Sequence, residues 1–144
     1  MTFFVDASIL IYSAVPSEHR AACLEVLDAI AGGNAEGRTS PSVLEEVWQI
    51  ERSRRAGDLD GLAERAYILM SPLLPVGDEA FRLALSVDAP GIGTNDRLHV
   101  GTCMANGIDD LFSADRDFDE VGTLRRIDPS DERGVRSLLD SSEL

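Results

Sequence analysis

Two apolar runs, one near each end of the sequence, lead directly into an aspartate. The run TFFV (residues 2–5) is followed by Asp6, and the run DLFSA (residues 110–114) is followed by Asp115. A short, continuous apolar run is typical of a strand that helices cover on both faces. Because sites in open parallel sheets form outside the carboxyl ends of the strands, we expect Asp6 and Asp115 to lie at one edge.

A third acid comes from the segment SPSVLEEVWQI (residues 40–50), which has the periodicity of a helix. Val43, Val47 and Ile50 recur at spacings of four and three and predict the inward stripe of that helix. Glu46 falls at the border of this stripe, whereas Glu45 points well away from it. Glu46 is therefore the better candidate for an inward carboxylate.

A fourth acid, Asp96, lies near the start of the predicted helix in GTNDRLHVGTCMANG (residues 93–107). Apolar residues surround most of this helix, which predicts a central and buried position. Asp96, His99, Cys103 and Asn106 share the narrow stripe that remains. We interpret His99 as a core histidine whose hydrogen bonds are satisfied, with a hydrogen bond near the site as the alternative.

Each of the four acids has an ordinary structural explanation when it is taken alone. Asp6 or Asp115 could cap the helical turn that follows, Asp96 could favour its own helix dipole, and Glu46 could be a partly solvated surface residue. Four carboxylates at one edge need a different explanation, because close like charges raise one another's pKa and oppose folding. A bound cation is the simplest compensation.

The predicted ligand set is made of oxygen atoms, which suits Mg²⁺ or Mn²⁺. The sequence offers no His/Cys cluster for zinc, because His19 and His99 lie far apart. A carboxylate-held Mg²⁺ with open coordination positions binds phosphates and activates water. The sequence therefore favours metal-dependent hydrolysis of phosphodiester bonds.

Composition excludes several other functions. The chain has 144 residues, 44% of them hydrophobic, which is enough for one domain with a real core. All thirteen basic residues are arginine, so a Walker-A loop, a Schiff-base lysine and the lysine of a phosphoacceptor receiver are excluded. We find no apolar span that could cross a bilayer and no signal peptide, and we expect a cytoplasmic protein. Cys23 and Cys103 read as buried free thiols.

The net charge of −13 argues against a protein whose entire surface binds nucleic acid. An acidic pocket repels RNA only without its metals, however, and local arginines can touch the phosphate backbone. The candidates for such contacts are Arg52, Arg54, Arg55, Arg97 and Arg116. Trp48 and Tyr67 could stack on bases, but packing against a neighbouring helix or a dimer partner is the better interpretation.

Strands and helices alternate along the chain, which predicts an α/β fold with a parallel-type sheet. Ser17 and Ser40 are the predicted N-caps of two of the helices, the second followed by Pro41 at the first helical position. The tail from residue 129 is polar enough for a surface helix or a mobile segment. We expect strands over residues 2–5, 37–40, 110–114 and 124–127, and helices over residues 7–14, 17–31, 41–56, 59–73, 78–87 and 94–106.

These motifs, in this order, resemble the PIN-domain ribonucleases, and in particular the VapC type of toxin from toxin–antitoxin pairs. The matching segments are VDASILI, TSPSVLEEV, TNDRLHVGTCMANGIDDLFSADRDFDEV and LRRID, which cover residue 3 to about residue 128. The resemblance implies a three-layer α/β/α sandwich with a central, mainly parallel, short-stranded sheet. It also implies a PIN-like nuclease domain over residues 1–128, with residues 129–144 as a tail or short helix of that domain.

The resemblance places catalytic and metal-binding roles on the same four acids. They are Asp6, Glu46, Asp96 and Asp115, with Ser8, Ser113 and Asp117 in support. The implied activity is endonucleolytic cleavage of RNA by water with Mg²⁺ or Mn²⁺. Arg52, Arg97 and Arg116 are the RNA contacts that we expect. The implied partners are a second copy of the chain, as a homodimer, and an antitoxin whose basic segment enters the acidic site.

Other functions remain open at this point. The chain could be a house-keeping RNA-processing nuclease of the same family, or a non-catalytic PIN-like module that binds RNA or protein. A module without chemistry would have no reason to tolerate clustered carboxylates. A haloacid-dehalogenase type of phosphatase fits less well, because it needs a carboxylate two residues after Asp6 and Ser8 stands there.

Overall fold

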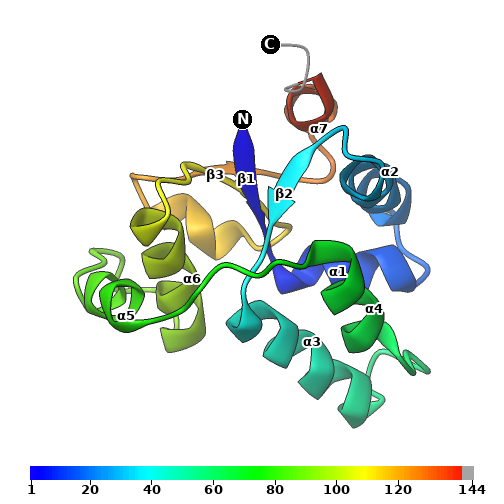
Figure 1. Ribbon diagram of the computed structural model, residues 1–144, viewed down its shortest axis with the longest axis horizontal. Coiled ribbons are helices and arrows are strands. Elements are labelled where there is room, and N and C mark those ends of the chain that lie inside the picture. Colours follow the sequence, from blue (N-terminus) through cyan, green and yellow to red (C-terminus); the bar gives the residue numbers. More distant parts are fainter. Residues whose placement is uncertain (141–144) are drawn as a thin grey trace.

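A four-stranded parallel sheet forms the centre of the computed structural model, which describes residues 1–140 (Figure 1). The strand order is β2-β1-β3-β4, so β1 and β3 are the inner strands. Phe4 of β1 pairs with Arg38 on one side and with Leu111 on the other. The bounds are β1 Thr2–Val5, β2 Glu36–Arg38, β3 Asp110–Phe112 and β4 Arg125–Ile127. The predicted α/β class and parallel sheet are confirmed.

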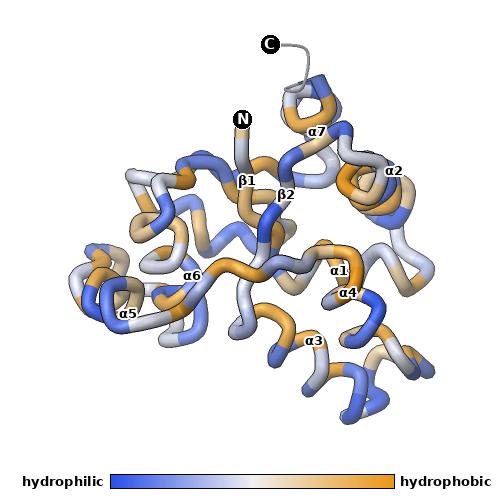
Figure 2. The backbone as a smooth tube through the Cα atoms, in the orientation of Figure 1, coloured by the Kyte–Doolittle hydropathy of each residue, from blue (hydrophilic) through white to orange (hydrophobic). Residues whose placement is uncertain are grey.

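Helices flank this sheet. In Figure 1, α5 and α6 lie on one side of β1 and β2, and α1, α2, α4 and α7 lie on the other. Figure 2 shows hydrophobic and hydrophilic stretches alternating along α2, α3 and α7, as expected for helices with one face on the core. The helices are α1 Ala7–Ala14, α2 Arg20–Ala31, α3 Pro41–Ser53, α4 Leu62–Met70, α5 Asp78–Leu85, α6 Thr94–Ala105, the 3₁₀ helix η1 Arg116–Glu120, and α7 Glu132–Leu139.

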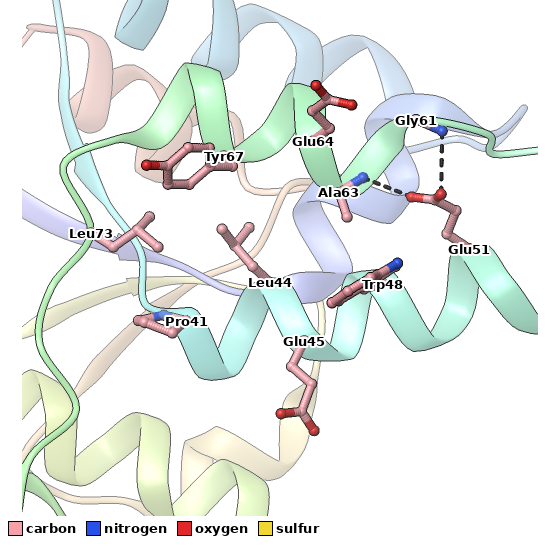
Figure 3. Close-up of a pocket in the computed structure, with 10 residues that line it drawn as sticks. All are labelled: Pro41, Leu44, Glu45, Trp48, Glu51, Gly61, Ala63, Glu64, Tyr67 and Leu73. Atoms are coloured by element: carbon pink, nitrogen blue, oxygen red, sulfur yellow. Dashed lines mark hydrogen bonds between the residues drawn. The ribbon is translucent and has the colours of Figure 1, made fainter.

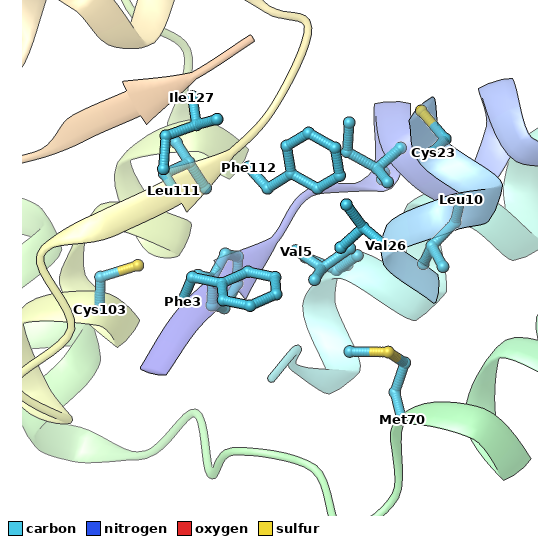
Figure 4. Close-up of a cluster of buried hydrophobic side chains, with 14 of the residues drawn as sticks. Phe3, Val5, Leu10, Cys23, Val26, Met70, Cys103, Leu111, Phe112 and Ile127 are labelled. Atoms are coloured by element: carbon cyan, nitrogen blue, oxygen red, sulfur yellow. The ribbon is translucent and has the colours of Figure 1, made fainter. Parts of the chain in front are cut away.

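The core forms where β1 and β3 meet the helices around them. Phe3, Phe4 and Val5 have no exposed surface, as the opening apolar run predicts. Burying one such side chain contributes about 2 to 3 kcal/mol to folding. Figure 4 shows the cluster, with residues of the sheet facing residues of the helices. The labelled members are Phe3, Val5, Leu10, Cys23, Val26, Met70, Cys103, Leu111, Phe112 and Ile127.

Both cysteines are free thiols inside this core, as predicted. Burial, together with the nearby charge of Asp128, raises the pKa of Cys23 to about 12. Burial and the nearby Asp6 raise the pKa of Cys103 to about 12 as well. Neither thiol therefore ionises near neutral pH.

Gly101 allows α5 and α6 to pack against each other. A Cβ atom at this position would lie 2.2 Å from the carbonyl oxygen of Ala80 and 2.7 Å from the backbone nitrogen of Ala84, closer than atoms can approach. A side chain here would push the two helices apart. The glycine thus fixes the position of α6, the helix that carries Asp96.

Several helix ends differ from their predicted positions. The Ser17 cap is wrong: a turn in which Arg20 N–H donates to Ser17 O comes first, and α2 begins only at Arg20. The α3 helix ends at Ser53 because Arg54 has a φ of 57°, in the left-handed region. By contrast, the Ser40 cap is confirmed, since its hydroxyl accepts a hydrogen bond from Val43 N–H with Pro41 in the first turn.

The C-terminal segment contains the helix α7, which packs on α2 through one buried face. Leu138 is fully buried and Val135 is 6% exposed. Contacts between α2 and α7 attach the segment to the body of the fold. Residues 141–144 of the predicted tail lie outside the described residues. Within residues 1–140, every helix is too short or too polar to cross a membrane.

Candidate metal centre

Asp6 is held at the carboxyl end of β1. Its N–H donates to Phe112 O at 3.1 Å, which extends the pairing of β1 and β3 by one residue. Its side chain is only 5% exposed and makes no capping bond to α1. Instead, Oδ2 accepts hydrogen bonds from Ser8 Oγ at 2.9 Å and from Ser113 Oγ at 2.7 Å. Both bonds stabilise the ionised carboxylate and leave Oδ1 for another partner.

The two serines also join the ends of β1 and β3. Ser8 Oγ accepts from Ala114 N–H at 3.1 Å, and Ser113 Oγ accepts from Asp115 N–H at 3.0 Å. Each hydroxyl therefore donates to Asp6 and accepts from the chain after β3. This arrangement fixes Asp6 relative to Asp115.

Glu46 reaches the same edge from α3. Thr39 Oγ1 donates to Val5 O at 2.8 Å, which brings the start of α3 next to the end of β1. Glu46 is partly buried, as its helical position predicts, and its Oε1 is 2.8 Å from His99 Nε2. Glu45 is exposed and accepts a hydrogen bond from Gln49 one turn along the same helix.

Asp96 lies in the first turn of α6 and is electrostatically coupled to the other acids. Burial raises its pKa to about 6, with further increases from the charges of Asp6, Asp115 and Glu46. The neighbouring His99 acts in the opposite direction. The charges of Asp6, Glu46 and Asp115 therefore act on Asp96, although Asp96 and Asp115 are not among the residues whose ligand atoms lie within 4.8 Å of one another.

Asp115 contributes from the start of η1. Its Oδ1 accepts a hydrogen bond from Asp117 N–H at 3.0 Å, so it also caps η1. The ordinary capping role and a place beside the other acids are thus compatible for this residue. The side chain of Asp117 is exposed and makes no such link.

His99 combines both interpretations from the sequence, because it is a core histidine and is also hydrogen-bonded near the site. It is 1% exposed, yet its ring nitrogen reaches Glu46. One ligand atom each from Asp6, Glu46 and His99 lie within 4.8 Å of one another. The helical stripe that His99 shares with Asp96 is the sequence feature that agrees with this position.

The donor set fits a divalent cation. Burial is the main cause of the raised pKa of Asp96, and the charges of Asp6, Asp115 and Glu46 raise it further, so keeping this carboxylate ionised has a cost. A cation between these carboxylates would remove that cost. Carboxylate oxygens are the ligands that Mg²⁺ and Mn²⁺ prefer.

A cleft of about 550 Å³ lies between α1 and α3, and Glu46 is the member of the four acids that lines it. Ser8, Tyr12, Arg55 and Asn95 also line this cleft. Arg55 therefore supplies a positive charge in the space next to Glu46. Such a charge is suited to a phosphate group of a bound nucleic acid.

The three arginines that were predicted to contact RNA lie in three different surroundings. The Arg97 guanidinium donates to the carbonyl oxygens of Val87, Ala89 and Ile92, at 2.7, 2.9 and 3.3 Å, and so secures the loop before α6. Arg52 lines a small pocket with Glu51, Arg54 and Asp60, away from the cleft. Arg116 is exposed in η1, next to Asp115. Contact with RNA by these residues stays a prediction.

A second, larger groove of about 610 Å³ runs between α3 and α4. Figure 3 shows Trp48 and Tyr67 along it, with Leu44 and Leu73 between the two helices. Trp48 is 56% exposed and Tyr67 is 51% exposed, so about half of each residue stays open to solvent. Glu51 closes one end by accepting hydrogen bonds from Gly61 N–H and Ala63 N–H. The interpretation that Trp48 and Tyr67 pack against a neighbouring helix or a dimer partner stays a prediction.

A family profile described as "PIN domain" matches residues 3–124. No curated protein matches the sequence significantly. Solved structures share the fold at low identity, which makes the likeness one of fold alone. VapBC2 from Rickettsia felis, bound to a DNA fragment from its promoter, has a TM-score of 0.68 at 15% identity, covering 89% of this chain and 98% of that chain.

Two further structures resemble this chain. VapC20 from Mycobacterium tuberculosis, described as a toxin that cleaves the sarcin–ricin loop, has a TM-score of 0.63 at 20% identity, covering 83% of this chain and 95% of that one. A protein from Pyrobaculum aerophilum has a TM-score of 0.62 at 18% identity, covering 99% and 98%. The family match covers most of the chain and agrees with these likenesses in fold.

Proposed function

Because this chain belongs to the PIN domain family, we propose that it is a metal-dependent endoribonuclease and the toxin of a toxin–antitoxin pair. The observation that carries the proposal is the electrostatic coupling of Asp6, Glu46, Asp96 and Asp115, which come from four separate segments. A fold with no chemistry to perform would gain nothing from a repulsion that opposes its own folding.

The four carboxylates would hold Mg²⁺ or Mn²⁺. When bound, such an ion supplies a Lewis acid for the phosphate and lowers the pKa of a bound water. Ser8 and Ser113 fix the orientation of Asp6 through their hydroxyl groups. Asp117 stands beside Asp115 as a supporting acid, and a carboxylate that does not bind the ion can take the proton of the attacking water.

RNA would lie in the cleft beside the acids. Arg55 in the cleft and Arg116 beside Asp115 are the positive side chains placed to meet the phosphate backbone. These contacts hold the backbone without reading the bases. The charge of the ion and of these two arginines compensates locally for the acidic remainder of the surface.

An antitoxin is the proposed protein partner. The net charge of −13 suits a basic segment, and the groove between α3 and α4 offers apolar surface of the kind that an amphipathic helix covers. Glu64 at that groove adds negative charge next to the aromatic rings. We propose that a helix of the antitoxin, apolar on one face and basic on the other, occupies this groove.

A homodimer in the cytoplasm completes the proposal. Phe81 is 58% exposed and Leu85 is 73% exposed, one turn apart on α5. Two large apolar side chains on one helix face are suited to burial against a second copy of the chain.

The test is cleavage of RNA by the purified chain with Mg²⁺ or Mn²⁺, compared with cleavage in EDTA. Asp6→Asn and Asp96→Asn should abolish cleavage while the circular dichroism spectrum stays that of the wild type. Glu79→Gln, a carboxylate replacement on the exposed face of α5, is the matched control and should cleave normally.

Full activity in EDTA, or in the two Asn variants, would overturn the proposed site. A chain that binds RNA and cleaves none under any metal condition would favour the non-catalytic module instead. Cleavage without growth arrest when the chain is expressed alone would favour the house-keeping nuclease over the toxin.

A further inference from the structure

His99 and Glu46 form the closest contact between side chains of α6 and α3 at the acid site. The distance from His99 Nε2 to Glu46 Oε1 is 2.8 Å. The histidine is 1% exposed and the glutamate 26% exposed, so the pair links the core to the site. A carboxylate oxygen can only accept, which assigns the proton of the bond to Nε2.

The imidazole ring is held from more than one side. It stacks against Phe4 of β1, with ring centroids 5.9 Å apart and an angle of 39° between the planes. Its other nitrogen, Nδ1, is buried and has no hydrogen-bond partner among residues 1–140. The hydrogen bond to Glu46 is thus the polar interaction that the ring makes there, and the surrounding packing fixes its direction.

Glu46, in contrast, is a long side chain near the surface of α3. Without a partner it would have several accessible rotamers, and holding it in one of them costs conformational entropy. The bond to His99 engages Oε1 and leaves Oε2 of the same carboxylate available to a cation. When one oxygen of a carboxylate is held by a hydrogen bond, the other oxygen is already oriented before the ion binds.

We propose that His99 is a positioning residue that orients Glu46 for the cation. The inference rests on the proposed metal-dependent function. His99 acts through Glu46 and does not bind the ion itself, because Nε2 is already used in the bond to Oε1 and Nδ1 is buried. Direct ligation would require that bond to break.

The test is the dissociation constant for Mn²⁺, measured by titration calorimetry on the full chain. His99→Leu should weaken Mn²⁺ binding by about 10- to 100-fold, the usual effect of removing a hydrogen-bond partner of a metal ligand. His99→Gln keeps an N–H donor at a similar reach and should recover most of the affinity. Val100→Ala, which removes equally buried packing from the same helix, should leave the affinity unchanged.

A double-mutant cycle separates positioning from ligation. In a Glu46→Ala background, where the acceptor is gone, His99→Leu should have no further effect on Mn²⁺ affinity if His99 acts through Glu46. A second loss of similar size in that background would make His99 a ligand and overturn the proposal. Equal affinities for His99→Leu, Val100→Ala and the wild type would overturn it as well.

Failure of the proposed function would look different. In that case the wild-type chain itself would bind no Mn²⁺, and RNA would not be cleaved. A wild type that binds Mn²⁺ and cleaves RNA, with His99 variants that do the same, would reject the role of His99 alone.

Discussion

Ser113 Oγ donates a hydrogen bond of 2.7 Å to Asp6 Oδ2, although the two residues are 107 positions apart in the sequence. The same hydroxyl accepts from Asp115 N–H. The side chain of Ser113, just after β3, therefore orients the carboxylate of Asp6 and also holds the backbone of Asp115. Parallel pairing of β1 and β3 is what brings the three residues together.

Ser113→Ala should lower both stability and activity. A buried hydrogen bond to a charged group contributes about 1.5 to 3 kcal/mol, so the free energy of unfolding should fall by that amount. Cleavage should fall by about tenfold or more, because Asp6 loses a fixed orientation. Urea unfolding and initial cleavage rates measure the two effects. Ser86→Ala, whose hydroxyl bonds only within α5, should change neither.

Asp96→Asn should stabilise the protein when metal is removed. The wild-type pKa of about 6, raised mainly by burial and then by Asp6, means that an ionised Asp96 opposes folding at neutral pH. A rise of about two pKa units is equivalent to about 3 kcal/mol, which solvent screening reduces to about 1 kcal/mol. Urea unfolding in EDTA at neutral pH measures the gain.

Adding Mg²⁺ or Mn²⁺ should make the wild type more stable than Asp96→Asn, because an ion that binds the folded state stabilises it by mass action. The wild type should then gain stability with ion concentration while Asp96→Asn gains little. A metal-free Asn variant that is less stable than the wild type would contradict the repulsion between these carboxylates.

The unfolding free energy should fall between about pH 4 and about pH 2 as Asp128 is protonated. Burial acts to raise the pKa of Asp128, but hydrogen bonds from Ser130 and Arg126 outweigh it and lower the pKa to about 2. A group with a lowered folded pKa stabilises above its unfolded value near 3.8 and loses this effect as the pH falls through the folded value. Asp128→Asn should therefore flatten the acid limb of the stability curve, by about 1 kcal/mol after allowance for solvent screening.

Urea midpoints at a series of acidic pH values provide the measurement. Asp140→Asn, an acid replacement at the end of α7 for which no such network is present in residues 1–140, should keep the wild-type slope. An Asp128→Asn variant with an unchanged slope would remove the link between this network and acid stability.

Trp48 fluorescence should report occupation of the groove between α3 and α4. Trp48 is the sole tryptophan in the sequence and is 56% exposed. Burial by a partner helix transfers the indole from water to an apolar surrounding, so its emission maximum should shift to the blue. The measurement is a titration of the chain with a basic amphipathic antitoxin helix. Tyr67→Ala should weaken the binding, and a scrambled helix of equal charge should produce no shift.

Leu138→Ala should destabilise the whole domain. Leu138 is completely buried on the inner face of α7, and removing such a leucine costs about 2 to 5 kcal/mol. Urea unfolding measures the loss. Ile68→Ala, at a position that is 70% exposed, should change the unfolding free energy by less than about 0.5 kcal/mol. A separate, earlier transition for α7 alone would contradict its place in the same cooperative unit.

Local patterns were sufficient to predict the strands and the direction of Glu46. Phe3, Phe4 and Val5 are buried as an unbroken apolar run requires, and the spacing of Val43 and Val47 gives the inward face of α3. These features depend on neighbours within a few residues. The parallel order of the strands follows from their alternation with helices, and the acids at their ends follow from that order.

Partners across the fold could not be predicted in the same way. His99 looked like a satisfied core residue because its spacing says nothing about Glu46, which lies on another helix. Arg97 looked like a surface cation, yet a loop of its own chain surrounds its guanidinium with carbonyl oxygens. The polar composition of α7 likewise gave no indication that Leu138 is buried in the core. Each of these three contacts depends on how the helices and loops pack together, and such packing produces no periodic pattern in the sequence.

The strand order also has a consequence for when the acid cluster can form during synthesis. Synthesis proceeds from the N-terminus, so β1 with Asp6 and α3 with Glu46 leave the ribosome long before β3. The hydroxyl that locks Asp6 arrives 107 residues later, on the strand that completes the centre of the sheet. A chain that ends before β3 therefore lacks Ser113 and Asp115, and its acid cluster is incomplete.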